Sequence, residues 1–227
     1  PGAGVNPQRI IQNFIRVAIK GLIINGHGNS YFVAQHAVAL LLTFMNKTIL
    51  HHQWMKQGKW RTGDKEATSI PLRFKKIGLL GYGAINKKIH KMLQGFNIEF
   101  SILRKHWDKQ DEQLITPVKK FSQYQVNEFC KEIDILIIAI PLTSKTEDLI
   151  GKEQLNMLGK EGIIINVGRG KIINEKALYN ALRDKTIEFR EQRIENNYIP
   201  KEDNNGKKYP YNYPFHDLYN FILSPHR

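Results

Sequence analysis

A short apolar run, followed at once by two closely spaced glycines and a helical pattern, narrows the possible folds of this chain more than any other stretch. Lys76–Leu80 has the length and composition of a buried strand, and the sequence Gly81-Tyr82-Gly83-Ala84-Ile85-Asn86 follows it directly. Downstream apolar residues recur at three- and four-residue steps, which is typical of a helix packed on one face. A strand, a Gly-x-Gly turn and a helix in this order predict the first unit of a dinucleotide-binding fold.

In such a unit the first glycine makes the tight turn and the second lets a pyrophosphate approach the backbone, while the helix N-terminus offers N–H groups to it. Asn86 stands where a third Gly or Ala normally permits close packing of the helix on the strand, so we expect a looser fit there. A tight turn without a ligand is the alternative for this motif alone. The residues expected to bind the cofactor are Gly81, Tyr82, Gly83, Ala84 and Ile85.

The end of the next predicted strand bears on the choice of cofactor. Glu99–Leu103 is followed by Arg104, 21 residues after Gly83, where NAD-binding units usually carry an acid for the ribose hydroxyls. Arg104 and Lys105 could instead pair with a 2′-phosphate, although basic residues at a strand end are often simply solvated. NAD and NADP both remain candidates, with a slight tilt toward NADP.

Apolar runs of strand length alternate with helical patterns along the chain. This alternation predicts an α/β fold with a doubly wound parallel sheet of the Rossmann type, covered by helices on both faces. The expected strands are Leu22–Asn25, Lys76–Leu80, Glu99–Leu103, Ile133–Ile140, Gly162–Val167 and Phe221–Leu223.

Two segments, a long helical pattern and a charged strand, have features of their own. The helical pattern of Ser30–Met55 predicts one long, buried connecting helix, with Asn29 or Ser30 as its cap and His36 on its apolar face. A strand is also due after the predicted helix Asn174–Arg183, yet residues 188–193 carry four charges in six positions. Because buried unpaired charges are costly, we expect this strand at an exposed edge of the sheet or displaced from it.

Composition limits the partners and the compartment. The net charge of +13 is spread over every segment, so we do not expect a nucleic-acid partner. No apolar run approaches the roughly 20 residues that a bilayer span needs, so no membrane partner is expected either. Cys130 is the single cysteine, which excludes an internal disulfide and makes the cytoplasm the expected location. His51-His52 has no further ligand at suitable spacing, so we expect no metal site.

Together with the glycine turn, three further stretches resemble the D-isomer-specific 2-hydroxyacid dehydrogenases. They are the segment Val33–Leu42, the segment Pro141-Leu142-Thr143-Ser144-Lys145-Thr146, and Asn166-Val167-Gly168-Arg169-Gly170 with Ser224-Pro225-His226. The four motifs occur in the family's order and at its spacings. The resemblance implies an oxidoreductase that transfers a hydride between NAD(P) and a 2-hydroxy or 2-keto acid.

The resemblance also implies roles for single residues. Arg169 takes the place of the family's arginine that binds the substrate carboxylate and carbonyl, a task that suits a forked and permanent cation. His226 takes the place of the general acid–base, and imidazole can exchange a proton near neutral pH. Arg169 as a mere loop cap and His226 as a frayed surface residue are the alternatives.

Further positions follow from the same resemblance. The turn Gly2-Ala3-Gly4 is similar to the family's backbone cradle for the substrate carboxylate. Ser144 and Glu147 have the spacing of a helix capping box, so Ser144 is expected to be structural. The residues expected to border the cofactor are Pro141, Leu142, Thr143, Thr146, Val167 and Gly168.

The chain departs from the family at two chemically important positions. Arg193 stands where the family has an Asp near the nicotinamide, and Tyr198 stands where the glutamate that pairs with the histidine belongs, unless Tyr198-Ile199-Pro200 is a gapped version of the motif. Tyrosine cannot supply a negative charge near neutral pH, so proton transfer would be weakened. A catalytically weak or inactive NAD(P)-binding or sensing module, or a remnant of such an enzyme, is therefore the alternative function.

The resemblance finally implies how the chain is divided. Residues 1–28 are expected to be a remnant of the substrate domain and its crossover, 29–222 the dinucleotide-binding domain, and 223–227 the start of the return to the substrate domain. With only fragments of that domain the reacting groups lose orientation, so this chain by itself should catalyse the reaction poorly. The sequence does not indicate which 2-hydroxy acid is the substrate. Family members usually dimerise through the cofactor domain and its long helix, so a homodimer is expected.

Overall fold

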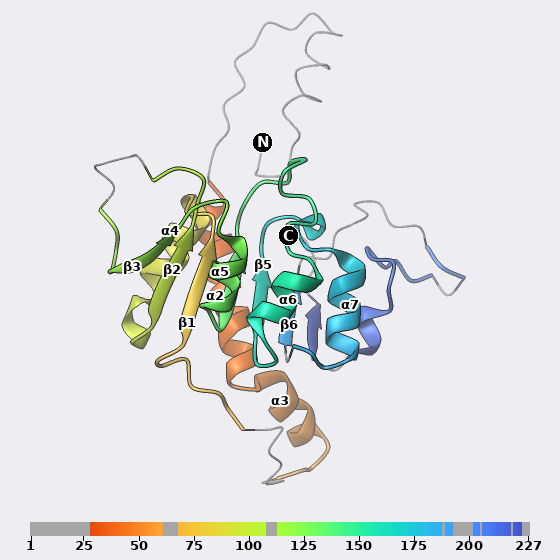
Figure 1. Ribbon diagram of the computed structural model, residues 1–227. Coiled ribbons are helices and arrows are strands. Elements are labelled where there is room, and N and C mark those ends of the chain that lie inside the picture. Colours follow the sequence, from red (N-terminus) through yellow and green to blue (C-terminus); the bar gives the residue numbers. More distant parts are fainter. Residues whose placement is uncertain are drawn as a thin grey trace, which may run out of the picture.

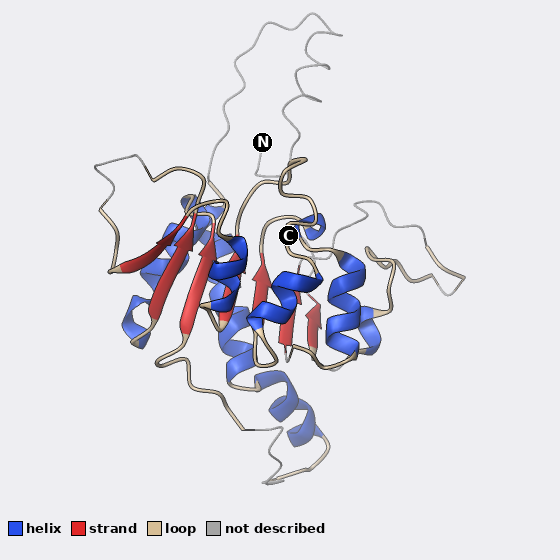
Figure 2. Cartoon of the chain, viewed as in Figure 1, coloured by secondary structure: helices blue, strands red, loops and turns tan. Residues whose placement is uncertain are grey.

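A seven-stranded parallel sheet forms the centre of the computed structural model, which describes residues 28–60, 68–107, 113–187, 189–192, 202–204, 206–218 and 220–223 (Figure 2). The order of the strands across the sheet is β3-β2-β1-β4-β5-β6-β7. In chain order they are β1 (Lys76–Leu80), β2 (Glu99–Leu103), β3 (Val118–Phe121), β4 (Ile135–Ile138), β5 (Ile163–Asn166), β6 (Phe189–Gln192) and β7 (Phe221–Leu223). The expected strand Leu22–Asn25 lies outside the described residues.

Helices cover both faces of this sheet (Figure 1). One apolar core joins α2 and α4 to the sheet, and a second core joins α5, α6 and α7 to the opposite face. The doubly wound α/β fold predicted from the sequence is thus confirmed. The helices are α2 (Ser30–Met45), α3 (Thr48–Lys56), α4 (Ala84–Leu93), α5 (Val126–Lys131), α6 (Lys152–Leu158) and α7 (Glu175–Arg183), with short 3₁₀ turns η2 (Gln94–Phe96), η3 (Gly170–Ile172) and η4 (Phe215–Asp217).

The order of the strands reverses beside β1. The chain runs outward from β1 through β2 to β3, then returns to place β4 on the other side of β1. Helices that follow β1 and β4 therefore leave toward opposite faces, which opens a crevice at the carboxyl ends of these two strands. This is where a ligand binds in sheets of this type.

The central strands are buried on both sides, as the apolar runs predict. Every residue of β4 and β5 is buried. At Gly78 in β1 an added Cβ would lie 2.3 Å from Ile133 Cδ1 and 2.7 Å from Phe129 Cζ, so α5 and the turn after it pack directly on the strand backbone. Cys130 lies in the same helix and is fully buried.

The prediction of one continuous helix over Ser30–Met55 is wrong. The helix breaks after Met45, and α2 and α3 meet at a bend of 58°. Lys47 adopts a left-handed backbone with φ of 52°, a conformation that ends a helix. α2 is the buried connecting helix, whereas α3 has no buried residue; His36 is half-buried rather than a core residue.

The expected place of the charged strand is also wrong. β6 lies inside the sheet, where it pairs in parallel with β5 on one side and β7 on the other. Its neighbour β7 continues the sheet by one strand, so the backbone groups of β6 have partners on both sides and β7 forms the edge. The opposite edge is β3, a strand that the sequence did not suggest because two exposed lysines, Lys119 and Lys120, fill its middle.

Candidate functional site

The turn that follows β1 is shaped by its first glycine. Gly81 has a φ of +84°, and an added Cβ would lie 2.5 Å from Ile140 Cγ2 and 3.0 Å from the Ala139 carbonyl oxygen. Its N–H donates to the carbonyl of Leu103 at the end of β2, at 2.8 Å. Only glycine fits both the conformation and the space, so the turn needs this residue for its geometry alone.

Asn86 ties the turn to helix α4 instead of loosening it. The side chain is fully buried, and its Nδ2 donates to the carbonyls of Leu80 at 3.1 Å and Gly81 at 2.6 Å. The expectation of a looser fit came from the volume of the amide compared with Gly or Ala. The amide instead satisfies two backbone acceptors of the turn, which makes it a brace for the glycine loop.

The second glycine leaves the start of α4 accessible. Gly83 is exposed, and an added Cβ would meet no atom within 4 Å. No side chain caps this helix, and neither Asp nor Glu lies in its first turn. Ala84 and Ile85 follow as its half-buried first residues. Uncapped N–H groups and the positive end of the helix dipole suit a phosphate, so this part of the loop fits a dinucleotide.

Tyr82, between the glycines, points into the core. It is 8% exposed, and its hydroxyl lies 2.9 Å from Nδ1 of His90 on α4. Burial lowers the pKa of His90 to about 4, so the imidazole is neutral at physiological pH. Sequence reasoning missed His90, although it falls on the buried stripe of α4 that also carries Asn86, Ile89 and Leu93.

The basic residues after β2 lie beside an aromatic ring. The Arg104 guanidinium carbon is 4.1 Å from the centre of the Trp107 ring, and Lys120 Nζ is 5.1 Å from the same centre. The Trp107 indole N–H donates to the Phe121 carbonyl and is thereby fixed at the end of β3. The half-buried Arg104 and the exposed Lys105 put cations, with no carboxylate among residues 103–107, at the end of β2.

The loop after β4 holds itself together through two threonines. Thr146 Oγ1 donates to the Pro141 carbonyl at 2.8 Å and accepts from the Thr143 N–H at 2.8 Å. The predicted capping box at Ser144 is wrong, because residues 144–148 form turns rather than a helix. Helix α6 begins only at Lys152, where Gln154 Oε1 accepts from the Gly151 N–H. Leu142, 37% exposed, projects from the loop.

A tight turn follows β5. Asn166 Oδ1 accepts from the Gly168 N–H and its Nδ2 donates to the Arg169 carbonyl, both at 2.9 Å. Val167, between Asn166 and Gly168, is buried and donates its N–H to the carbonyl of Ile138 in β4. Arg169 is half-buried, and its Nη1 donates to the Gly168 carbonyl at 3.2 Å. The turn thus presents the guanidinium at the carboxyl edge of the sheet.

Ile140 joins these turns into one region. Added Cβ atoms on Gly81 and on Gly168 would both meet it, at its side chain and its carbonyl oxygen respectively. Three segments therefore share the crevice beside β1 and β4. They are the glycine loop (Gly81–Gly83), the Pro141 loop (Pro141–Thr146) and the Arg169 turn (Asn166–Arg169). The expected residues Gly2, Ala3, Gly4 and His226 lie outside the described residues, as do Arg193 and Tyr198.

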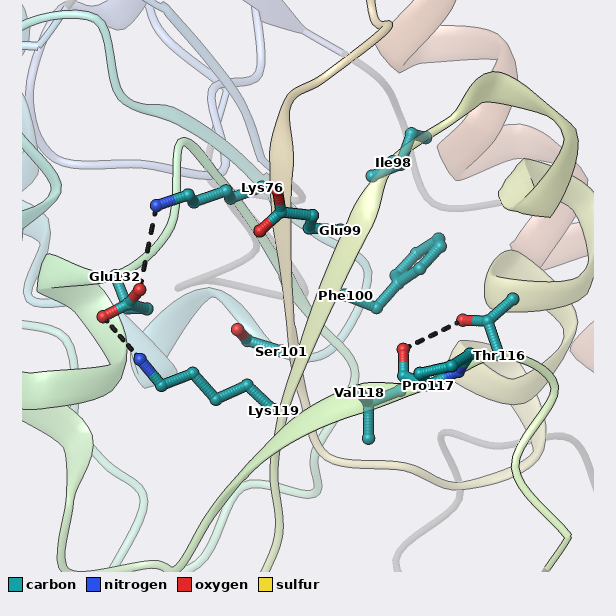
Figure 3. A pocket seen from close by; sticks show the side chains of 10 residues that line it. All are labelled: Lys76, Ile98, Glu99, Phe100, Ser101, Thr116, Pro117, Val118, Lys119 and Glu132. Carbon is teal, nitrogen blue, oxygen red and sulfur yellow. Dashed lines mark hydrogen bonds and ion pairs between the residues drawn. The ribbon is translucent and has the colours of Figure 1, made fainter.

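A separate cavity of about 350 Å³ lies at the other end of the sheet (Figure 3). Its lining includes the first residues of three strands, Lys76, Glu99 and Val118, so it opens at the amino edge and is distinct from the crevice. Glu132 lies between Lys76 and Lys119, with the shorter contact, 2.8 Å, to Lys119. The two lysines lower the pKa of this carboxyl group, Lys119 more than Lys76.

Neither a metal cluster nor a single membrane-spanning helix is present in the described part of the chain. It contains no group of three or more His, Cys, Asp or Glu residues that could hold a metal ion. No single helix there is long and apolar enough to cross a membrane, although α2 and α3 taken together across their bend meet the length and composition.

Curated proteins with related sequences include glyoxylate/hydroxypyruvate reductases. The glyoxylate/hydroxypyruvate reductase HPR3 of Arabidopsis thaliana is 29% identical over 171 residues, which are 74% of this chain and 50% of that protein. Glyoxylate/hydroxypyruvate reductase B of Enterobacter agglomerans is 33% identical over 68% of this chain and 47% of its own length. The chain spans about half the length of these relatives.

Solved structures share the fold over most of the chain. The NAD-dependent formate dehydrogenase of Staphylococcus aureus, solved with NAD, has a TM-score of 0.71 and 25% identity, covering 88% of this chain and 56% of that one. The NADPH-dependent glyoxylate/hydroxypyruvate reductase of Sinorhizobium meliloti, solved with citrate, has a TM-score of 0.75 and 24% identity, covering 98% and 64%.

A family model matches the part of the chain that contains the loops of the candidate site. The model of the D-isomer specific 2-hydroxyacid dehydrogenase, NAD binding domain, matches residues 38–227, which include the glycine loop, the Pro141 loop and the Arg169 turn. The chain therefore belongs to the D-isomer specific 2-hydroxyacid dehydrogenase family.

Proposed function

We propose that this chain is the cofactor-binding part of an NAD(P)-dependent oxidoreductase that interconverts a 2-hydroxy acid and a 2-keto acid. The observation that carries the proposal is the glycine loop at the point where the strand order reverses. Its second glycine opens onto the uncapped N-terminus of α4. That arrangement suits a pyrophosphate, and membership of the family supports the reaction class.

The proposed chemistry assigns one task to each of two residues. When bound, the dinucleotide would supply the hydride for C2 of the keto acid, and His226 would donate the proton to the C2 oxygen, giving the 2-hydroxy acid. Arg169 would hold the carboxylate and the carbonyl with forked donors. Its place on a turn braced by Asn166 supports this role, because a fixed guanidinium orients the substrate without further reorganisation.

The proposed division of the chain follows from this assignment. Residues 29–222 would form the dinucleotide-binding domain, while residues 1–28 and 223–227 would belong to the connections with a substrate domain. The turn Gly2-Ala3-Gly4 would contribute backbone N–H groups to the substrate carboxylate. The last strand of the sheet, β7, ends at Leu223, within one residue of the second boundary, which supports placing it there.

The direct test is binding followed by turnover. NAD or NADP at about 100 times its dissociation constant should stabilise the fold by roughly 2.7 kcal/mol in a thermal-shift titration. Glyoxylate and hydroxypyruvate, which related reductases are named for, are the first substrates to assay with NADH and NADPH. Turnover of this chain by itself should be low but measurable, and Arg169→Ala should abolish most of it while leaving cofactor affinity nearly unchanged. Absence of a shift with either dinucleotide would refute the proposal.

The non-catalytic module remains the second proposal because specific sequence positions favour it. Arg193 replaces an acid of the family, and Tyr198 replaces the glutamate that would sustain the basicity of His226. A binding or sensing module would bind the dinucleotide, show no oxidation or reduction of 2-keto or 2-hydroxy acids, and be indifferent to Arg169→Ala. The same assays thus separate the two proposals.

The choice between NAD and NADP rests on the end of β2. Arg104 beside Trp107, with Lys105 next to it, supports a preference for the 2′-phosphate of NADP. Arg104→Asp should move the ratio of the two dissociation constants toward NAD by at least about tenfold if the cation binds that phosphate. An unchanged ratio would assign Arg104 to packing against Trp107.

We also propose a homodimer, in the cytoplasm, formed through α2 and α3. The support is that α3 has no buried residue and that large apolar side chains are exposed on this helix pair, including Phe32 (72%) and Met55 (52%). A second copy of the chain would bury them. Sedimentation analysis should give a dimer that Met55→Glu weakens; a concentration-independent monomer would contradict the assignment.

A further inference from the structure

Behind the glycine loop, side chains from separate segments form a continuous hydrogen-bonded chain. The Tyr82 hydroxyl lies 2.9 Å from His90 Nδ1, and His90 Nε2 lies 2.8 Å from Thr116 Oγ1. The Thr116 hydroxyl donates in turn to the carbonyl oxygen of Pro117, at 3.2 Å (Figure 3). The chain connects the turn after β1 to the segment that leads into β3, and it passes through helix α4.

One arrangement of hydrogen atoms satisfies every member. The Pro117 carbonyl can only accept, so Thr116 donates its single hydroxyl hydrogen there and accepts from His90 Nε2–H. Nδ1 then carries a lone pair and accepts from the Tyr82 hydroxyl. The imidazole in this arrangement is neutral, which agrees with the burial that lowers the pKa of His90 to about 4.

The surroundings fix the orientation of the imidazole. His90 is fully buried, and its ring centre lies 4.1 Å from that of Phe100 in β2. The Tyr82 ring also lies beside it, 5.8 Å between centres. The bond between Tyr82 and His90 is itself buried. This packing therefore favours one orientation of the imidazole, because turning the ring would leave buried polar atoms without partners.

We propose that His90 is a positioning residue for the cofactor loop: through Nδ1 it holds the Tyr82 hydroxyl and thereby sets the backbone of Gly81–Gly83 for the pyrophosphate. Asn86 restrains the same loop from α4 through the Gly81 carbonyl. Together the two side chains fix both the first glycine and the residue that separates it from the second. The inference rests on the proposed function, because the loop's ligand there is the dinucleotide.

Two amide substitutions at one position separate positioning from packing. In His90→Asn the amide occupies the place of Nδ1 and can still accept from Tyr82, whereas in His90→Gln it occupies the place of Nε2 and keeps only the contact with Thr116. Tyr82→Phe removes the hydroxyl and leaves the ring. All three remove part of the network, so each is expected to lower stability, but the variants differ in whether the Tyr82 bond survives.

The measurements are the dissociation constants for NAD and NADP and the hydrogen-exchange rate of the Gly81 amide, whose N–H bonds the Leu103 carbonyl. His90→Gln and Tyr82→Phe should each weaken binding of the preferred dinucleotide by about three- to tenfold and speed the exchange in cofactor-free protein. His90→Asn should stay within about twofold of the wild type in both measurements. Nitrogen chemical shifts of the wild-type imidazole should show the Nε2–H tautomer.

Three results would overturn the inference. Equal weakening by His90→Asn and His90→Gln, affinities that merely follow the loss of stability, or an Nδ1–H tautomer would each make His90 a packing residue. Wild-type protein that binds neither dinucleotide would refute the proposed function instead. In that event the exchange rates of Gly81 alone decide: a difference between the two amide variants supports positioning of the loop, and identical rates overturn it.

Discussion

Two loops border the crevice at the carboxyl ends of β1 and β4, and they are held in opposite ways. The glycine loop is anchored from below by side chains in the core, Asn86 at its carbonyls and Tyr82 through its hydroxyl. The Pro141–Thr146 loop is braced by its own threonines through hydrogen bonds that water can reach. A buried bond is costly to break because its partners lose solvation, whereas water replaces an exposed one.

The difference fits what each loop would do in the proposed enzyme. A pyrophosphate needs N–H groups in fixed directions, so a rigid loop preserves binding energy. A loop beside the nicotinamide must accommodate both the cofactor and a substrate, and a self-braced segment can adjust without disturbing the core. The two loops therefore differ in rigidity because the hydrogen bonds that hold one are buried and those that hold the other are exposed.

The largest expected effect comes from the first glycine. Gly81→Ala should destabilise the fold by about 2–4 kcal/mol, because it combines a positive φ with contacts to Ile140 and Ala139. Gly83→Ala is the matched control: its Cβ meets nothing, so stability should change by less than about 0.5 kcal/mol while dinucleotide affinity falls at least about tenfold. Chemical denaturation and cofactor titration measure both. Equal losses of stability would contradict the distinction between the two glycines.

The next effect tests the buried brace. Asn86→Ala should cost about 1–3 kcal/mol in free energy of unfolding, since two backbone carbonyls lose their donor in the core. Asn46→Ala removes an exposed amide that also donates to a backbone carbonyl, that of Leu42, and should cost less than about 0.5 kcal/mol. Urea denaturation of both variants compares them directly. A similar loss in both would show that burial is not what strengthens the glycine loop.

The dependence of stability on pH follows from His90. Its pKa is about 4 in the folded protein and 6.5 in the unfolded chain, so between these values the unfolded chain binds more protons. His90 therefore leaves the free energy of unfolding unchanged above pH 6.5. As the pH falls from 6.5 toward 4, the free energy of unfolding decreases by up to about 1.4 kcal/mol per pH unit. His90→Asn removes this group; the difference between wild type and variant in the free energy of unfolding should therefore shrink on acidification. A difference independent of pH from 4 to 6.5 would refute the assignment.

The smallest effect is expected in the self-braced loop. Thr146→Val removes the hydroxyl that joins Pro141 to Thr143, but water can replace it, so the free energy of unfolding should fall by no more than about 1 kcal/mol. Ser144→Ala in the same turn should be neutral. Thermal denaturation checks both, and a loss for Thr146→Val as large as that of Asn86→Ala would erase the contrast between the loops.

Local patterns sufficed for the parts of the fold that depend on neighbours in sequence. The run Lys76–Leu80 predicted β1 with its correct bounds, and the two glycines and the periodic apolar residues after them predicted the turn and a following helix, α4. The helix predicted over Asn174–Arg183 is α7, with Asn174 as its cap, whose Oδ1 accepts from the Ala177 N–H. These features follow from propensity, capping and periodicity within about ten residues.

Features set by distant contacts were not predictable in this way. The helix breaks at Lys47, although no Gly or Pro next to this residue indicates a break in the sequence. β6 is internal because β7, some 30 residues later in the chain, pairs beside it. At the candidate site, Asn86 was judged by its size, whereas its role depends on carbonyls that only the folded turn presents. The contact of His90 with Thr116 joins residues 26 positions apart, which no motif encodes.

The burial of Cys130 has a practical consequence for measuring this protein. It is the single thiol of the chain and lies at 0% exposure in α5, the helix that packs on the backbone of the internal strand β1. A thiol reagent can modify it only when α5 lifts away from the strand or the whole fold opens. The labelling rate at low reagent concentration therefore reports the fraction of open molecules, and its limit at high concentration reports the opening rate. Cys130 is thus a native probe of the opening of α5, and no engineered cysteine is needed.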